Sequence, residues 1–530
     1  MQVKIMSVMR RLVIGFVAAL FLLTVEPIAV ARVQSEVQAA TTSMSYATAA
    51  RFLEQATWGP NATDIATLRQ IGFAPWFTQQ RTVAESTFPI APTTANNSFA
   101  QATFIYNAMN GPDQLRQRMA FAVGQIFVVS GVKLQVDAME PYLQTLQDNA
   151  FANYRQVMQA VTLSPSMGRY LDMANNDKPN PKKGTLPNEN YARELLQLFT
   201  IGTVKLNLDG TAQLDSNGSP IPTYDQTQIQ NLARVFTGWT YPTQPGATPL
   251  PHNTQYFVGQ MIPVESNHDM DSKVVFGTTL PGGQTAETDL AQTLDIVFKH
   301  PNLPPFVSLR LIQHFVTSNP SPAYVKRISN IFINNGLGVR GDLFAVIKAI
   351  LLDPEARQGD NNIATQVLTG GHLREPVLYA IGIMRALRVT VAASNSVAGA
   401  IAPMGQLLLF PPSVFNYYSP FYRIKGGALA GPEFQLLTPS TAVVRANFVN
   451  GLLNLHAGGG VTVDLTPYIN IAGNTVQLLN AVNQTLMRGQ MPSTMGSTIA
   501  KAVNASTDPA TRAKSALYLA ATSGLYQVEH

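Results

Sequence analysis

The sequence contains no cysteine among its 530 residues. Disulfide bridges, thiol catalysis, thiolate zinc sites and iron–sulfur clusters are therefore excluded. A bound metal ion would have to be held by histidine and carboxylate side chains. The stability of the fold must come from its core, because no covalent cross-link between cysteines is available.

Charged residues are also scarce, at 13 % of the chain against the usual quarter. The formal net charge is only +5, and the densest basic cluster, Lys178, Lys182 and Lys183, lies among prolines and glycines in an expected loop. No basic stripe interleaved with aromatic residues is present, so we expect no nucleic-acid partner. With 46 % hydrophobic residues, the composition is that of a globular protein and not of a disordered chain.

The motifs of several common enzyme classes are missing as well. The chain has no G-x-G-x-x-G, Walker, H-E-x-x-H or G-x-S-x-G sequence, and we expect no nucleotide, haem or iron–sulfur cofactor. An S-x-x-K tetrad runs from Ser130 to Lys133, but the S-D-N and K-T-G partners of penicillin-binding enzymes do not follow it. The sequence leaves open a divalent metal ion as a cofactor.

Only one long apolar run is present, at residues 12–25. It is preceded by Lys4, Arg10 and Arg11, is closed by Glu26 and Pro27, and is followed by the small-x-small triplet Ala29, Val30 and Ala31. This order predicts a signal peptide at 1–31, cleavage near Ala31, and export to the periplasm or the exterior. The alternative, a retained membrane anchor, needs about 20 apolar residues. Later apolar runs are interrupted by Gln125 and Lys348, so we expect no membrane span in the mature chain.

After a small, polar tether at 32–45, helix-period patterns recur from residue 46 to the end of the chain. The clearest runs from Asp225, a candidate N-cap, through apolar residues at i, i+3, i+4 and i+7 from Ile229, and stops at Gly238. Pro304 and Pro509 each stand where a further helix is expected to begin. We predict a mainly α fold, with residues 46–530 forming a single large multi-helix globular domain.

Two kinds of interruption are expected between the helices. At 206–224, Asp209-Gly210 and Asn217-Gly218 bracket alternating polar and apolar residues, which predicts a small β-hairpin or meander inserted in the helical fold. Glycine and proline are dense at 241–251, at 410–431 and at 458–460, which predicts long loops. A functional site is more often found on such loops than on the helices.

The segment 187–202 reads P-N-E-N-Y-A-R-E-L-L-Q-L-F-T-I-G. It is followed in order by F-T-G-W at 236–239, H-D at 268–269, H-P at 300–301, R-E-P at 374–376, G-Q at 405–406 and P-P at 411–412. In sequence and spacing these motifs resemble the bacterial family called Domain of Unknown Function 1800, from Arg51 to about Tyr526. The resemblance implies an exported, largely helical protein of one family domain. Members are often encoded beside another exported family that looks like sulfatases, so the resemblance implies an exported partner protein but assigns no chemistry.

The first candidate site lies at the start of the 187–202 segment. Helical geometry places Glu189 and Arg193 on one face, close to Asn188, at the positive end of a helix dipole. A polar first turn of this kind could present all three side chains to a ligand or substrate. The alternative is structural, with an N-cap and an i,i+4 ion pair that fix the helix against its neighbours.

The second candidate site is the loop from Glu265 to Lys273, which concentrates carboxylates around a single histidine. His268, Asp269 and Lys273 are candidate catalytic residues, since a loop histidine beside carboxylates can act as a general base. His268, Asp269 and Asp271 are candidate ligands of a divalent metal ion. The alternative is that the short His-Asp run caps turns.

Further partners for this site could come from His300, His314, Arg374 or Glu375. Helical spacing puts Arg310 and His314 on one face, for which a partly exposed polar surface is the simpler interpretation. Arg374 and Glu375 are expected to form structural salt bridges at the start of a helix. Trp239 could line a carbohydrate surface, although packing is the more common role of such a residue.

The sequence favours an exported hydrolase-like enzyme acting on envelope or extracellular polymers, with its site formed by the 187–202 segment and the His268 loop. The alternative is a non-catalytic binding or scaffold protein that aids export or assembly of an envelope partner. The enzymatic hypothesis rests on two polar segments, around residues 190 and 270, converging on a shared cavity in a charge-poor protein.

Overall fold

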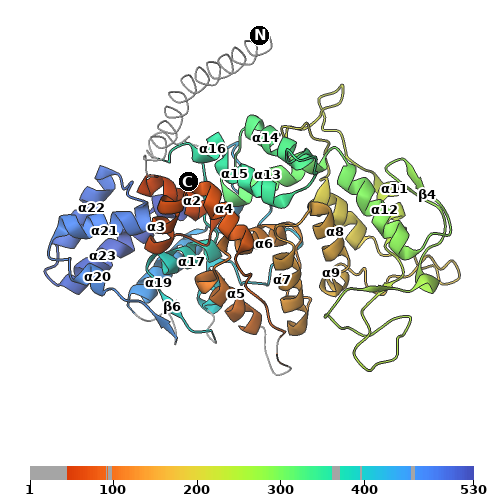
Figure 1. Ribbon diagram of the computed structural model, residues 1–530, viewed down its shortest axis with the longest axis horizontal. Coiled ribbons are helices and arrows are strands. Elements are labelled where there is room, and N and C mark those ends of the chain that lie inside the picture. The colour runs from red at the N-terminus through yellow and green to blue at the C-terminus, as the bar shows by residue number, and fades with distance from the viewer. Residues whose placement is uncertain (1–43, 91, 93–97, 361–369, 394–396, 455–459) are drawn as a thin grey trace, which may run out of the picture. The chain divides into compact units, whose positions relative to one another are not determined.

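The computed structural model describes residues 44–90, 92, 98–360, 370–393, 397–454 and 460–530 (Figure 1). Tyr46–His530 form one compact unit, separate from Met1–Ser45. The predicted signal peptide at 1–31 and all but the last two residues of the predicted tether lie outside the described residues. Within the described chain the fold is mainly helical, as predicted, and none of its helices is long and apolar enough to cross a membrane.

Residues 46–170 form a series of short helices around α6. They are α2 (Tyr46–Ala56), α3 (Ala62–Ile71), α4 (Phe73–Thr82), α5 (Ser98–Asn110), α6 (Gln114–Ile126), the 3-10 turn η1 (Val136–Ala138), α7 (Met139–Asp148), α8 (Tyr154–Thr162) and α9 (Pro165–Tyr170). Helix α6 contacts α2, α4, α7 and α13, and its buried residues include Gln117 and Arg118 as well as apolar side chains. Polar groups of α6 therefore reach the interior of the protein.

The helices of residues 190–357 include the two whose starts the sequence predicts, at Asp225 and Pro304. They are α10 (Asn190–Glu194), the π-helical turn η2 (Leu195–Thr200), α11 (Gln226–Val235), the 3-10 turn η3 (Glu265–Asn267), α12 (Ala286–Lys299), α13 (Leu303–Phe315), α14 (Pro322–Ile333), α15 (Leu343–Leu352) and α16 (Pro354–Arg357). The side chain of Asp225 accepts a hydrogen bond from the Gln228 N–H at the start of α11, as predicted. Pro304 and Pro305 lie in the first turn of α13, where their missing N–H groups cost no helical hydrogen bond.

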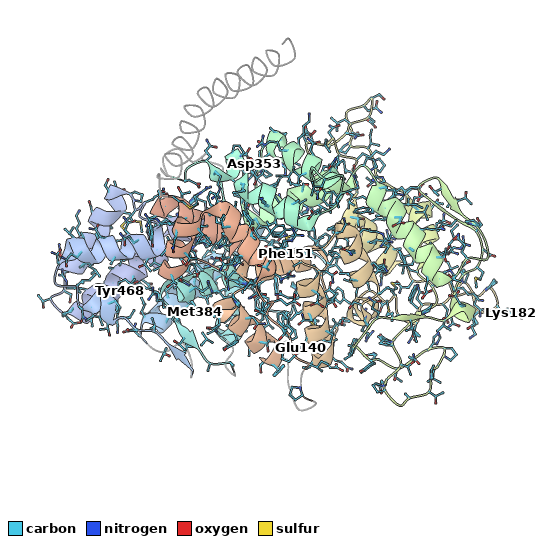
Figure 2. All side chains as sticks on the ribbon, in the orientation of Figure 1. Glu140, Phe151, Lys182, Asp353, Met384 and Tyr468 are labelled. Carbon is cyan, nitrogen blue, oxygen red and sulfur yellow. The ribbon has the colours of Figure 1, made fainter. Side chains whose placement is uncertain are left out.

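The C-terminal part of the chain encloses α17, whose surface is buried nearly all round. Its helices are α17 (Pro376–Ala386), α18 (Ala398–Ile401), the 3-10 turns η5 (Ala402–Met404) and η6 (Pro432–Leu436), α19 (Pro439–Leu453), α20 (Thr466–Ile469), α21 (Thr475–Met487), α22 (Ser493–Asn504), α23 (Pro509–Ala521) and α24 (Gly524–Gln527). Apolar residues of α17, α19 and α21 to α23 share one core cluster. Met384 of α17 lies inside it, whereas Lys182 lies at the periphery on an exposed loop (Figure 2).

The strands of the described chain are short and form antiparallel two-stranded sheets. The pairs are β1 (Trp239–Thr240) with β2 (Ile262–Pro263), β3 (Lys273–Val275) with β4 (Thr278–Leu280), β5 (His372–Leu373) with β8 (Val528–Glu529), and β6 (Thr390–Val391) with β7 (Val461–Thr462). The third pair joins the start of α17 to the last residues of the chain, with His372 opposite Glu529.

The predicted insertion at 206–224 is a small meander. Isolated bridges pair Leu206 with Ala212 and Leu214 with Pro220, so the chain reverses twice. The two reversals contain Gly210 and Gly218, at φ 80° and 78°. Because side chains other than those of glycine and asparagine rarely adopt this conformation, both glycines fix the positions of the turns, as their sequence predicted.

Candidate functional site

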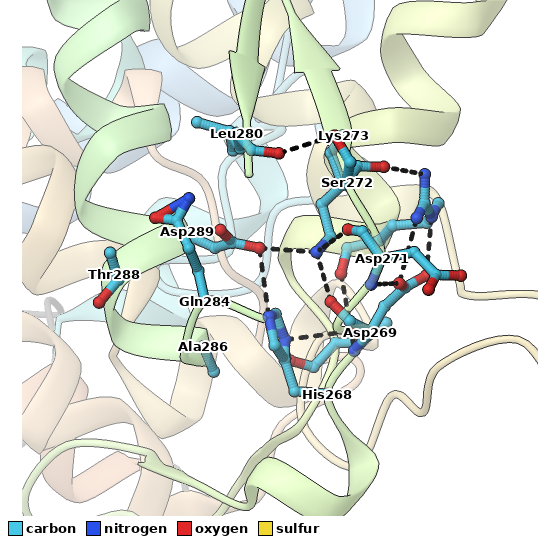
Figure 3. A network of polar contacts seen from close by, with 12 residues as sticks. His268, Asp269, Asp271, Ser272, Lys273, Leu280, Gln284, Ala286, Thr288 and Asp289 are labelled. Carbon is cyan, nitrogen blue, oxygen red and sulfur yellow. Dashed lines mark hydrogen bonds and ion pairs between the residues drawn. The ribbon is translucent and has the colours of Figure 1, made fainter. Parts of the chain in front are cut away.

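The side chains of the His268 loop form a network of hydrogen bonds (Figure 3). His268, Asp269 and Lys273 are buried in it. The ring of His268 is 0 % exposed, with Nδ1 2.9 Å from the Thr237 carbonyl oxygen and Nε2 3.2 Å from Oδ2 of Asp289. The ammonium of Lys273 lies 2.7 Å from the same Oδ2 and also donates to the carbonyls of Asp269 and Asp271. Both nitrogens of His268 are therefore occupied by oxygen atoms of the protein.

Asp269 is paired with an arginine of α11. Its Oδ2 accepts from Nε of Arg234 at 2.7 Å, and its Oδ1 accepts from Nη2 at 3.1 Å. Burial alone would raise the pKa of Asp269, but the hydrogen bonds from Arg234 and the Asp271 N–H, together with the charges of Arg234 and Lys273, more than offset this effect and lower it. A low pKa and a bidentate arginine keep the carboxylate ionised and occupied, which suits a structural ion pair better than a proton acceptor.

The predicted metal ligands are not arranged as a metal site. In the described parts of the chain, no group of three histidine, aspartate or glutamate residues is placed to hold a metal ion. His268 faces Thr237 and Asp289, Asp269 faces Arg234, and Asp271 is exposed at the surface. The three side chains therefore have separate surroundings, although they are close in sequence.

The polar start of the 187–202 segment forms a surface cluster. Nη2 of Arg193 donates to Oε2 of Glu189 at 2.9 Å, which is the i,i+4 pair expected from the sequence. Gln226, at the start of α11, donates to the same carboxylate at 2.9 and 3.0 Å. The side chain of Asn188 accepts from the Asn190 N–H, beside the first turn of α10. These contacts fasten α10 to α11.

Helix α11 also separates the two predicted halves of the site. Gln226 of the Glu189 cluster and Arg234 of the His268 network lie at opposite ends of it, about 12 Å apart along the helix axis. Four cavities lined by described residues do not include Glu189, Arg193 or His268 in their linings. The two clusters therefore contact opposite ends of α11, and a cavity shared by the two segments stays a prediction.

Two cavities do lie near the C-terminal end of α6. The first, of about 80 Å³, is mainly apolar, and the second, of about 40 Å³, is lined by polar and aromatic residues. Gln125 and Asn416 line both, and we call this pair the amide wall. Oε1 of Gln125 accepts hydrogen bonds from Nδ2 of Asn416 and from the hydroxyl of Tyr418, each at 3.0 Å.

A buried carboxyl group lies behind the amide wall. Glu375 is 3 % exposed, and its oxygens accept from Nε2 of Gln125 at 2.8 Å and from Nε2 of Gln406 at 2.5 Å. Burial raises the pKa of Glu375 to about 7, although the two amides oppose the shift. In the described structure Glu375 makes no ion pair, so the expectation of a salt bridge at this residue is wrong. Its partners are neutral amides, which leave the proton affinity high.

The second cavity contains a buried cation and an uncharged imidazole. Arg310 is 7 % exposed and lies between the rings of Phe306 and Phe421, at 5.3 and 4.6 Å. Burial lowers the pKa of His314, one turn further along α13, to about 3, so its ring is neutral at physiological pH. The sequence correctly placed Arg310 and His314 on one face. The interpretation of that face as a partly exposed surface is wrong for Arg310, because the 410–421 loop covers it.

The 187–202 segment contributes to this cavity with its apolar face. Leu198 lines the cavity, and Gly202 packs so closely on Phe306 that an added Cβ would lie 2.8 Å from its ring. Leu198 belongs to the π-helical turn η2, and Gly202 follows it. This turn rotates the end of the segment relative to a regular α-helix. The segment therefore reaches the cavity with Leu198, and not with its polar first turn.

Two of the seven non-glycine residues with positive φ in the described chain lie in the loop that lines both cavities. Leu409 and Asn416 have φ of 69° and 66°. This region is unusual for leucine, and such residues persist where surrounding contacts hold them and are common at functional sites. Leu409 lines the first cavity and Asn416 belongs to the amide wall.

A second buried group of charges lies on the other side of β5. Glu54 of α2 is 2.6 Å from Nη1 of Arg488 and 3.0 Å from Nη2 of Arg374. Arg374 thus forms the structural ion pair expected from the sequence. His372 lies 3.5 Å from Glu433 and 3.7 Å from Glu529, distances too long for hydrogen bonds. Burial would lower the pKa of His372, but these carboxylates more than offset burial and raise it to about 10.

Trp239 and the S-x-x-K tetrad have structural roles. Trp239 is 3 % exposed in β1, so it packs in the interior and does not form a surface for carbohydrate. The hydroxyl of Ser130 donates to the Pro411 carbonyl, and Lys133 pairs with Asp172 at 2.7 Å. Serine and lysine therefore have different partners and do not form a nucleophile and base.

Comparison with known proteins identifies the family and leaves the chemistry open. No curated protein matches the chain, and no solved structure matches it. A family model described as a protein of unknown function (DUF1800) matches residues 51–528, in agreement with the motifs at 187–202, 236–239 and 374–376. The chain therefore belongs to the DUF1800 family.

Proposed function

We propose that the protein is an exported hydrolase-like enzyme whose active centre lies at the amide wall. The observation that carries this proposal is Glu375, a buried carboxyl group with a pKa of about 7 that is hydrogen-bonded directly to the cavity residue Gln125. Such a group exists in both protonation states near neutral pH, so it can accept a proton and return it. Perturbed carboxyl groups beside a cavity are common at catalytic sites.

The surroundings of the wall supply the other groups that hydrolysis requires. Arg310 would stabilise the negative charge that develops on a substrate oxygen, since its guanidinium is buried beside the second cavity. His314 lines the same cavity as a neutral hydrogen-bonding group. Gln125 is half-buried, and rotation of its side chain would open Oε1 of Glu375 to the cavity. The cavities are small, so a substituent or a chain end of an envelope or extracellular polymer would enter, and not the polymer itself.

In this proposal the residues first suggested by the sequence stabilise the scaffold. His268, Asp269 and Lys273 hold the β3 loop against α11 and α12, Glu189 and Arg193 hold α10 against α11, and Asn188 accepts from the first turn of α10. Their role is to fix the region from which Leu198 reaches the second cavity.

Replacing Glu375 by Gln tests the active centre. On a panel of model esters, sulfates and glycosides, we expect kcat/KM of the best substrate to fall about a hundredfold, which is the usual contribution of a general base. The wild-type rate should increase as pH rises through about 7, because the carboxylate is the reactive form, and the variant should lack this increase. Steady-state rates between pH 5 and 9 measure both effects.

The matched control is Glu140→Gln. Glu140 is also buried and its pKa is also raised by burial, but it lines neither cavity. The activity and the pH profile of the Glu140→Gln variant should equal those of the wild type. Equal activity of the Glu375 variant and the wild type across the panel would reject the active centre. Complete inactivity of the folded wild type would favour the alternative, a non-catalytic binding or scaffold protein.

Export is part of the same proposal and has its own test. The supporting features are the basic residues Lys4, Arg10 and Arg11, the apolar run at 12–25 and the small residues that end at Ala31. Expression of the whole chain in a bacterium with two membranes should give a mature protein that begins at Arg32 and is released with the periplasmic fraction. N-terminal sequencing of that fraction measures the cleavage site. An intact N-terminus in the cytoplasmic fraction would reject export.

A further inference from the structure

The first cavity is built from apolar side chains of three regions of the chain. Its lining includes Trp58, Phe104, Phe121, Tyr142, Leu146 and Leu408. Trp58 meets Phe104 and Phe121 with ring centroids 5.2 and 5.0 Å apart. We call this space the apolar cavity. Aromatic walls of this kind are rigid and already in contact with one another, so the space exists without a ligand to hold it open.

Most of the polar side chains in the lining are already occupied by protein partners, whereas Nε1 of Trp58 is buried without one. Nε2 of Gln117 and Nε2 of Gln147 both donate to Asp113, at 2.8 and 2.5 Å. The hydroxyl of Tyr142 donates to the Phe127 carbonyl at 2.6 Å. An occupant would therefore find few hydrogen-bond partners along these walls. Water is poorly held in such a space, whereas an apolar group gains by leaving water.

The amide wall belongs to the lining of the apolar cavity and is shared with the second cavity. Gln125 and Asn416 stand there, with Glu375 directly behind. A ligand that fills the apolar cavity would therefore place its polar end against the groups proposed to react. An apolar body with one polar end describes an acyl group, with its chain in the cavity and its carbonyl at the wall.

We propose that the apolar cavity is the acyl pocket of the enzyme and that the substrate is an ester of a short, unbranched acyl chain. This inference rests on the proposed function. The cavity has a volume of about 80 Å³. That is roughly half of the ~150 Å³ of a cavity that accommodates benzene, so a chain of about four carbons fits and a longer one does not.

The reaction is the hydrolysis of the ester by water. The water oxygen forms a bond to the acyl carbon, and the bond from that carbon to the alcohol oxygen breaks. Glu375 takes the proton from the attacking water and returns it to the departing alkoxide, and Arg310 balances the charge on the carbonyl oxygen meanwhile. The products are a short carboxylic acid and the free hydroxyl of the polymer. No oxidant, reductant or second substrate is required.

Binding can be measured without hydrolysis by titrating the protein with acetamide, butyramide and octanamide. Of the three tryptophans, Trp58 lines the apolar cavity, so its fluorescence emission should change on binding, and a Trp58→Phe variant should lose this change. Butyramide should bind about 15-fold more tightly than acetamide, since each buried methylene group contributes about fourfold. Octanamide should bind no more tightly than butyramide.

Two variants change the volume of the apolar cavity in opposite directions. Ala120→Leu fills it and should remove the preference of the protein for butyramide over acetamide. Leu146→Ala enlarges it and should shift the best chain length from four carbons towards six or more. The same shifts should appear in the rates with p-nitrophenyl esters of two to ten carbons. Because the two variants predict opposite results, a folding defect in one of them leaves the other informative.

The outcomes for the acyl pocket and for the active centre can be told apart. Selective binding of butyramide together with absence of hydrolysis in every ester would support the pocket and reject the enzyme. Hydrolysis that depends on Glu375 but not on chain length, in the wild type and in both cavity variants, would support the enzyme and overturn the pocket. Affinity that increases steadily through octanamide would also overturn it.

Discussion

Replacing Asp289 by Asn is expected to lower the free energy of unfolding by about 3–5 kcal/mol, the usual result of removing one partner from a buried ion pair. Asp289 is 0 % exposed, and the ammonium of Lys273, also buried, lies 2.7 Å from its Oδ2. His268 donates to the same oxygen. With an amide in place of the carboxylate, Lys273 would keep only the carbonyls of Asp269 and Asp271. Urea unfolding measured at neutral pH gives the change directly.

Asp271→Asn is the control for this measurement. Asp271 belongs to the same loop, but it is exposed, so its replacement should change stability by less than about 0.5 kcal/mol. A cost below about 1 kcal/mol for Asp289→Asn would contradict the structural role of the network. In that case the loop would hold its charges for another purpose, and catalysis by His268 would need to be considered again.

Glu54→Gln is expected to have an effect at least as large. Glu54 is 7 % exposed and separates two buried guanidinium groups, those of Arg374 and Arg488. Burial would raise the pKa of Glu54, but the two arginines more than offset burial and lower it, so the residue is ionised at neutral pH. Loss of its charge would leave two cations facing each other away from water, at a cost of about 3–5 kcal/mol. Chemical unfolding at a constant ionic strength measures this cost.

A surface ion pair provides the comparison for the buried one. Arg155 and Asp295 are 2.6 Å apart, but the side chain of Asp295 is 55 % exposed. Asp295→Asn should therefore cost less than about 1 kcal/mol, because water and salt screen the pair. If Glu54→Gln and Asp295→Asn had equal effects, the buried charges would not be contributing as the structure indicates.

Much of the fold could be predicted because helix ends are encoded locally. The capping aspartate Asp225, the first-turn proline Pro304 and the Asp508-Pro509 pair each start a helix where the sequence placed it. Gly210 and Gly218 fixed the meander in the same way. These features need only a few neighbouring residues, so one sequence is enough to recognise them.

The π-helical turn shows the limit of that approach. A regular helical wheel puts Leu195 and Phe199 on one side of the 187–202 segment, and both are buried. It could not predict that hydrogen bonds from Ile201 and Gly202 would both reach back to the Leu196 carbonyl, because packing on Phe306 decides the geometry there. This turn determines which side chain of the segment lines the second cavity.

The candidate site was largely missed because its residues come from distant parts of the chain. Gln125 was noticed only as a polar interruption of an apolar run, which was the one local signal of its role. Glu375 looked like a partner for arginine, and no spacing rule indicates that its neighbours are Gln125 and Gln406. In contrast, the clusters around residues 190 and 270 are visible in the sequence, but their charged side chains form ion pairs with neighbouring side chains.

The charges around Glu54 join the two ends of the folded unit. Helix α2 supplies Glu54, β5 supplies His372, and the C-terminal strand β8 supplies Glu529, which also lies 4.0 Å from Arg374. The first helix of the folded unit is therefore completed by residues of its last strand. Folding of this unit can be finished only after β8 has been made, and loss of β8 would weaken the unit first at α2.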